Sequence, residues 1–171
     1  MRIRFMGREY RVSKKGFFDV SGNRPAYSVC VILAKYVLLE PDKVYMDSQW
    51  VSFKDFKRDS YFTNVNYFTS DTEQIIVKRF SGKLDAFAHA GQTLGGLHHE
   101  LAASYDLAME FAALPRISLL PLFNDKEDPF SAHCSVLFQK HAEFYLDPES
   151  FAMTSACLAK RLKETHQACT G

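Results

Sequence analysis

The chain has 171 residues and a formal net charge of +1, and 47% of its residues are hydrophobic. That length is typical of one domain, and the apolar share is enough for a core without metal or disulfide staples. The balanced charge argues against a nucleic-acid partner, and the sequence contains neither a run long enough to span a membrane nor a secretory signal. We therefore expect one soluble, cytoplasmic domain over residues 1–171.

The four cysteines are scattered along the chain and include no Cys-x-x-Cys pair. This spacing fits neither a zinc site nor a disulfide framework. The prediction is four free thiols in a reducing cytosol, with one pairing, Cys30 with Cys134, left open. The sequence also contains no iron–sulfur motif.

The first third of the chain predicts short strands followed by a helix. Residues 2–20 combine β-favouring side chains with turn residues. Pro25 is a good first helical residue, and apolar positions recur at helical spacing from Ala26 to Leu39. Because this segment is apolar almost all round, we expect a central, buried helix at about residues 25–39.

The middle of the chain predicts an irregular aromatic segment and then a helical pair. Residues 42–69 form a long connection, and such connections are usually functional or contain short elements. Ser70–Glu73 has the form of a capping box, which predicts that a helix follows it. A second helix should end at Gly95-Gly96, which gives a helical pair over about residues 71–95.

The last third alternates between apolar and polar residues and predicts strands. Residues 107–112 show this alternation, and residues 117–123 form a mostly apolar run typical of a central strand. Pro121 within that run indicates an edge strand or a bulge. Further strands are expected at residues 132–138 and 144–146.

The chain ends in a predicted helix. Asp147-Pro148-Glu149 supplies an N-cap, a proline at the first helical position and an acidic first turn, so we expect a C-terminal helix at about 148–167. Strands and helices without regular βαβ alternation favour an α+β fold. The expected architecture is a mostly antiparallel sheet packed with the helix at 25–39, the helical pair and the C-terminal helix.

Several segments together resemble one known family, a prokaryotic domain of unknown function numbered 3786. The segments are Phe5–Val12, Trp50–Phe53, Leu94–Gly96, Leu114–Leu120, Asp128–Phe130, Val136–Phe138 and Tyr145–Glu149. The resemblance covers almost the whole chain and implies no activity, catalytic residue or cofactor. Some members carry a Cys-rich iron–sulfur module, which does not carry over to this sequence. Members usually begin with further helical residues, so we expect either a short member or one whose start has been lost.

The aromatic segment at residues 45–68 is the first candidate site. Its rings could line a pocket for a flat or apolar ligand, or cover a protein partner. The alternative is a loop packed onto the core. The candidate binding residues are Trp50, Phe53, Tyr61 and Tyr67.

Two further candidates are polar. The acidic turn at residues 125–128, with Asp128, could bind a divalent cation or do acid–base work, or it could be a hairpin turn whose Asp side chains bond their own backbone. His98 and His99, with Asp128 and His133, are candidate metal ligands, although the His-Glu-x-x-His spacing is absent. The alternative for the histidines is a solvated loop after Gly95-Gly96.

Basic residues are interleaved with aromatic residues in the first 24 positions. This pattern can bind single-stranded nucleic acid, but alternation on a half-exposed sheet produces it as well. The balanced charge of the whole chain favours the second interpretation.

No motif in the sequence assigns a reaction, so function is left as two hypotheses. The first is a non-enzymatic accessory domain that binds a small ligand or a protein partner through the aromatic segment and the acidic turn. The alternative is a metal-dependent enzyme with a His/Asp site. The cofactor is unknown, a homo-oligomer is compatible with the sequence, and no nucleophile motif favours covalent catalysis.

Overall fold

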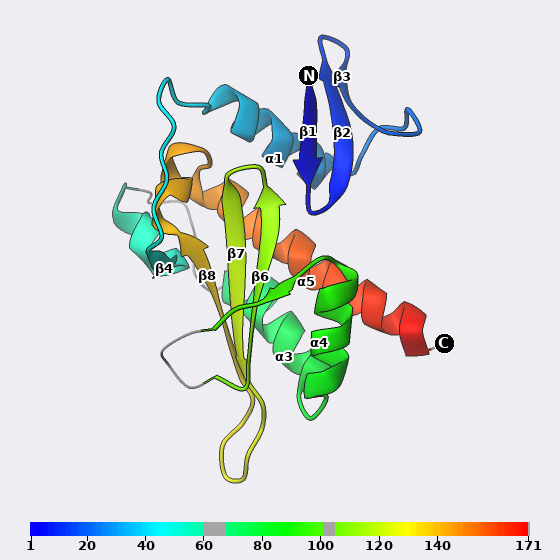
Figure 1. Ribbon diagram of the computed structural model, residues 1–171, viewed down its shortest axis with the longest axis vertical. Coiled ribbons are helices and arrows are strands. Elements are labelled where there is room, and N and C mark those ends of the chain that lie inside the picture. Colours follow the sequence, from blue (N-terminus) through cyan, green and yellow to red (C-terminus); the bar gives the residue numbers. More distant parts are fainter. Residues whose placement is uncertain (60–67, 101–104, 171) are drawn as a thin grey trace.

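The computed structural model describes residues 1–59, 68–100 and 105–170, and it has an α+β fold (Figure 1). Two antiparallel sheets form its β part, one of three strands and one of five. The predicted α+β class and the mostly antiparallel pairing are therefore confirmed.

The small sheet is formed by the N-terminal strands β1 (Arg2–Phe5), β2 (Arg8–Ser13) and β3 (Gly16–Asp19), in that order. A tight turn at Met6-Gly7 joins β1 to β2, with φ of 47° and 76°, in the left-handed region where glycine is favoured. The Met6 N–H donates to the Ala113 carbonyl at 2.8 Å, which ties this turn to the large sheet.

The large sheet has the strand order β4-β8-β7-β6-β5. Its strands are β4 (Trp50–Ser52), β5 (Leu97–His98), β6 (Leu107–Leu114), β7 (Ile117–Asn124) and β8 (His133–Gln139). The two short strands, β4 and β5, form its two edges.

Helices cover one face of the large sheet (Figure 1). These are α3 (Gln74–Phe80), α4 (Leu84–Thr93) and α5 (Pro148–Thr170), whereas α1 (Tyr27–Leu38) packs against α5. Phe87 of α4 connects the helices to the sheet, because its ring lies 4.9 Å from the Phe80 ring and 5.3 Å from the Phe123 ring, centroid to centroid. Aromatic side chains therefore fill the core between the two layers.

The first helix forms as predicted, but it is not a buried central helix. Only Ile32 and Leu33 of α1 are buried, whereas Tyr27 and Leu38 at its two ends are 84% and 78% exposed. Apolar side chains lie on all sides of α1, which is why the sequence predicted burial. In the structure α1 is a surface helix, and only one stripe of such a helix can face the core.

The helical pair also forms, but Ser70–Glu73 is not a capping box. Phe68 is already helical and a π turn follows at Thr69–Glu73, so Ser70 lies inside helical structure and not at its N-cap. The Glu73 carboxylate instead accepts a hydrogen bond from the Val136 N–H of β8 at 3.1 Å. A sequence pattern that caps an isolated helix is used here to join that helix to the sheet.

In the last third, the predicted central strand at residues 117–123 forms as β7, whereas the edge or bulge indicated by Pro121 and the strand at residues 144–146 do not form. Pro121 lies in β7, between β6 and β8, and not at an edge. Pairing with β8 continues through Pro121 and Val136, and the register with β6 is the same on both sides of Pro121, since its shift lies between Ala112 and Leu114. Residues 144–146 form no strand, since Lys140–Phe144 is a 3₁₀ turn.

The start of the C-terminal helix matches its prediction. The Asp147 carboxylate accepts a hydrogen bond from the Ser150 N–H at 2.8 Å, which is the N-cap contact expected ahead of Pro148. The helix continues to Thr170, three residues beyond its expected end. All four cysteines are free, so Cys30 and Cys134 are not paired.

Candidate functional site

The second face of the large sheet, away from the helices, carries the most prominent polar and aromatic cluster. Side chains alternate between the two faces of a strand, and Ala108, Leu120 and Leu122 form a small buried cluster separate from the main core. Trp50 and Leu137 pack against this cluster and are half-buried. This arrangement gives the sheet a second, smaller core.

Trp50 and His99 reach this face from opposite edges of the sheet. Trp50 belongs to edge strand β4, while His99 follows edge strand β5 and donates its N–H to the Ala108 carbonyl at 3.0 Å. The indole and imidazole rings nevertheless meet edge to face, with centroids 5.6 Å apart. Trp50 therefore packs against both the buried cluster and the imidazole of His99 on this face.

Glu110 holds the imidazole of His99 in this position. The two side chains lie 3.1 Å apart, Nδ1 to Oε2, and are 26% and 31% exposed. A carboxylate at Nδ1 orients an imidazole and leaves Nε2 for an exchangeable proton or a ligand. The cluster can therefore present an oriented histidine next to an aromatic ring.

A pocket of about 450 Å³ lies on the other side of Trp50, along β4. The Ser52 N–H and hydroxyl both donate to the Asp55 carboxylate at 2.8 Å, and the Lys140 N–H donates to the Gln49 carbonyl at 2.8 Å. These bonds fix the backbone on two sides of the pocket. The full lining is Gln49, Trp50, Val51, Ser52, Asp55, Phe56, Lys140 and Glu143.

Most other aromatic candidates belong to the core. Phe53 is 3% exposed, and its ring stacks on Phe68 with centroids 4.3 Å apart. Phe56 is half-buried, with its ring 4.7 Å from that of Phe151. Tyr61 and Tyr67 lie outside the described residues. Among the described candidates from this segment, Trp50 thus combines partial exposure with a pocket.

The acidic turn lies far from Trp50. Trp50 pairs with Gln139 at one end of β8, whereas Asp128 belongs to the loop that precedes His133 at the other end, and this hairpin projects from the sheet (Figure 1). The Asp125 carboxylate accepts hydrogen bonds from its neighbour Lys126, at 2.7 Å, and from the Gly82 N–H, at 2.6 Å. Asp125 therefore bonds both its own turn and the α3–α4 connection at Gly82, and neither of these hydrogen bonds involves Trp50.

The four predicted metal ligands are not brought together. His99 is paired with Glu110, His98 is exposed on β5, and His133 is exposed opposite Asn124 at the start of β8. In residues 1–59, 68–100 and 105–170, no three His, Cys, Asp or Glu side chains are grouped to hold a metal ion.

Sequence reasoning missed the residues that hold the segment before β4. His141 is buried, with Nδ1 accepting from the Asp47 N–H and Nε2 donating to the Arg116 carbonyl, each at 2.9 Å. The Tyr145 hydroxyl accepts from the Tyr45 N–H at 2.9 Å. Both side chains fasten an irregular segment that leads into Trp50. No local sequence pattern predicts these two contacts, because Tyr45 and Asp47 lie about a hundred residues away from Tyr145 and His141.

Glu73 and Cys134 were also missed. Burial raises the pKa of the Glu73 carboxyl above its usual range, although the hydrogen bond from Val136 opposes this shift. Burial likewise raises the pKa of the Cys134 thiol, with a further contribution from the Glu73 charge. A thiol of raised pKa is a poor nucleophile, so this buried pair is structural.

The fold and this site define the chain as an α+β domain. The family model described as Domain of unknown function (DUF3786) matches residues 1–161, and the chain belongs to that family. No curated protein and no solved structure matches the chain. In the described part of the chain, no helix is both long and apolar enough to cross a membrane.

Proposed function

We propose that the chain is a non-enzymatic accessory domain that binds a small ligand at Trp50, in the cytoplasm of a prokaryotic cell. The observation that supports this most is a half-buried indole that forms part of a pocket of about 450 Å³. Pockets for small ligands usually have volumes of roughly 300–1,000 Å³ and combine aromatic walls with a few polar groups. Four free cysteines are consistent with a reducing compartment.

The lining indicates a ligand with one flat face and hydrogen-bonding edges. Trp50 and Phe56 supply aromatic surface, while Gln49, Ser52 and Lys140 supply donors and acceptors. Asp55 and Glu143 add negative charge opposite the Lys140 ammonium. A neutral or zwitterionic heteroaromatic compound matches this mixture better than a strongly anionic one. The acidic turn at residues 125–128 is not part of the proposed site.

The experiment is a thermal-shift and calorimetric titration with adenine, nicotinamide and indole as probes. Saturable binding of at least one probe, lost in Trp50→Leu and retained in Tyr27→Leu, would support the proposal. Tyr27 is the matched control because its ring is 84% exposed and lies away from the pocket. Equal binding by the wild type and Trp50→Leu, or no binding of any probe, would count against it.

The second candidate is the metal-dependent enzyme with a His/Asp site, although the structure does not group its four predicted ligands, His98, His99, Asp128 and His133. Only the oriented His99 in its pair with Glu110 favours it. Elemental analysis of freshly purified protein tests this candidate. Stoichiometric metal that is lost in His99→Gln would support it. Metal-free protein whose melting temperature is unaffected by a chelator would eliminate it.

A further inference from the structure

A groove of about 620 Å³ lies at the other end of the molecule, independent of Trp50. It runs between the β1–β2 hairpin, the start of α1 and the second half of α5, which Figure 1 shows close together. The sequence interpretation singled out none of its α5 residues. Its central residues are Arg8, Tyr10, Val29, Cys157 and Arg161.

Arg161 places an uncompensated positive charge in this groove. The side chain is half-buried, its Nη1 donates to the Met6 carbonyl at 2.7 Å, and its guanidinium lies 5.8 Å from the Phe5 ring centroid. Within the described residues it forms no ion pair with a carboxylate. Half-buried cations are normally paired, so this one is energetically costly as it stands.

Arg8 brings a second guanidinium to the same place. Burial lowers the pKa of Arg161 and the nearby positive charge of Arg8 lowers it further, whereas the hydrogen bond with the Tyr10 side chain raises it. Two like charges that face one groove repel each other, and an anion between them would relieve this repulsion. Arginine is well suited to the role, because its planar fork matches the oxygens of phosphate and carboxylate.

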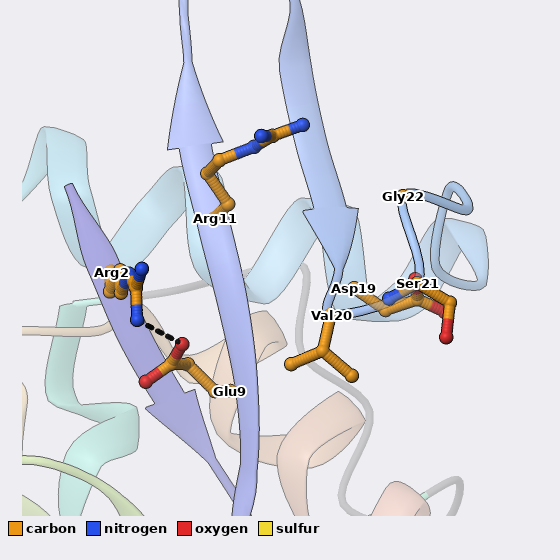
Figure 2. A pocket seen from close by; sticks show the side chains of 7 residues that line it. All are labelled: Arg2, Glu9, Arg11, Asp19, Val20, Ser21 and Gly22. Carbon is orange, nitrogen blue, oxygen red and sulfur yellow. Dashed lines mark hydrogen bonds and ion pairs between the residues drawn. The ribbon is translucent and has the colours of Figure 1, made fainter.

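The acidic residues around the groove are already engaged. Glu9 pairs with Arg2 at 3.1 Å, on the outer face of the small sheet (Figure 2). The Asp19 carboxylate accepts from the Ser21 N–H at 2.9 Å, within the turn after β3 that Figure 2 also shows. The third acid, Glu164, pairs with Lys160 at 3.8 Å. The Asp19 carboxylate keeps its negative charge, whereas within the described residues neither Arg8 nor Arg161 forms an ion pair with any of the three acids.

The remaining wall is small and partly apolar. Pro25, Ala26 and Val29 line it from the α1 side, together with the Ser28 hydroxyl, which lies 3.8 Å from the Cys157 sulfur. An apolar body could lie on these side chains while an anionic head group meets the two arginines. We propose that this groove binds a small organic phosphate whose phosphate group lies between Arg8 and Arg161.

The sequence contains a charge asymmetry, although Arg8 is the one basic residue among the first 25 that lines the groove, together with Glu9 and Asp19. The first 25 residues hold seven basic and two acidic side chains, so their net charge is +5, whereas the remaining residues hold 14 basic and 18 acidic side chains, a net charge of −4. The overall value of +1 conceals this separation. A balanced total therefore does not exclude a locally basic binding site.

The test is calorimetric titration at fixed ionic strength with phenyl phosphate, inorganic phosphate, benzoate and phenol as probes. We expect phenyl phosphate to bind more tightly than inorganic phosphate, and phenol not to bind. Benzoate binding as tight as phenyl phosphate binding would overturn the assignment to phosphate. Equal heats for phenol and phenyl phosphate would show apolar contact alone and would overturn the proposal.

Arginine variants locate the binding. Arg8→Gln and Arg161→Gln should each weaken phenyl phosphate by about tenfold or more, as expected for loss of one charge-assisted contact. Arg24→Gln is the matched control, because Arg24 is an exposed arginine that does not line the groove. Arg8 is exposed, so its variant remains informative if Arg161→Gln fails to fold. If all three variants bound phenyl phosphate equally weakly, the affinity would depend only on the net charge of the protein, and the proposal would be overturned.

Discussion

The indole of Trp50 and the imidazole of His99 meet with ring centroids 5.6 Å apart, although their backbones lie at opposite edges of a five-stranded sheet. This contact covers Leu120 and Leu122, which are 0% and 3% exposed on a face that none of the described helices covers. The same tryptophan forms part of the pocket on which the proposed function rests. Stability and binding therefore depend on one side chain.

Replacement of Trp50 by alanine should lower the free energy of unfolding by about 2 kcal/mol, since a half-buried ring loses less than a fully buried one. Urea denaturation followed by circular dichroism measures this change. Tyr27→Ala, at an 84% exposed ring, should change stability by no more than about 0.5 kcal/mol. If both variants lose the same amount, Trp50 does not cover a second core.

Loss of the Tyr145 hydroxyl should loosen the segment before β4 without affecting the core. Tyr145→Phe removes the acceptor for the Tyr45 N–H and a contact from Arg116, so the expected cost is about 1 kcal/mol. Hydrogen exchange should accelerate at the Tyr45 amide and remain unchanged in β7. Unchanged exchange at Tyr45 would show that the hydroxyl does not fasten this segment.

Acid should weaken the contact between α1 and the start of α5. Burial of Asp147 opposes its charge, but the hydrogen bonds from Lys35 and Ser150 outweigh burial and hold the pKa of this carboxyl below its usual range. A depressed carboxyl pKa contributes stability above the unfolded value of about 3.9, and this contribution is lost as pH falls through the lower folded pKa. The stability difference between the wild type and Asp147→Asn should therefore shrink as the pH falls below about 4.

The ion pair between Lys35 and Asp147 can also be tested by replacing Lys35. Lys35→Met removes the cation 2.8 Å from the Asp147 carboxylate and should abolish most of the same acid-dependent difference. Asparagine is a good N-cap, so Asp147→Asn keeps the helix start and isolates the charge. A difference that is constant from neutral pH to acid would contradict the role assigned to this pair.

Gly91 should tolerate no side chain. A Cβ at this position would lie 2.4 Å from the Met109 sulfur and 3.3 Å from the Phe111 ring, where α4 packs on β6. Gly91→Ala should therefore cost about 1–3 kcal/mol through overpacking, despite the better helix propensity of alanine. Gln92→Ala, on the exposed side of the same helix, is the control and should be close to neutral. A stabilised Gly91→Ala protein would contradict the close packing.

The sequence predicted regular elements well because their signals are local. Alternation, helical spacing and the Asp147-Pro148 cap depend on neighbours within a few residues, and each led to an observed element. Predictions that needed tertiary information failed. Apolar spacing along α1 could not show that its ends stay exposed, and Glu73 matched a local capping pattern although its partner lies on β8.

The candidate site was predicted only in part. Trp50 stood out as the single tryptophan in an aromatic segment, and the structure places it beside a pocket. Its neighbour His99 was selected as a metal ligand, whereas its observed partner is Glu110. That pairing depends on the register of β5 with β6, which no short-range pattern specifies. Arg161 was missed because its lack of a carboxylate partner is visible only after folding.

The most direct test of the Trp50 site is a ¹H–¹⁵N NMR titration with adenine, nicotinamide and indole, followed at the indole N–H resonance. Trp50 is the only tryptophan, so this signal needs no further assignment. The account predicts that at least one probe shifts this resonance saturably, together with the amides of Gln49 and Ser52. A probe that binds while these signals stay unchanged, or no binding by any probe, would contradict the account.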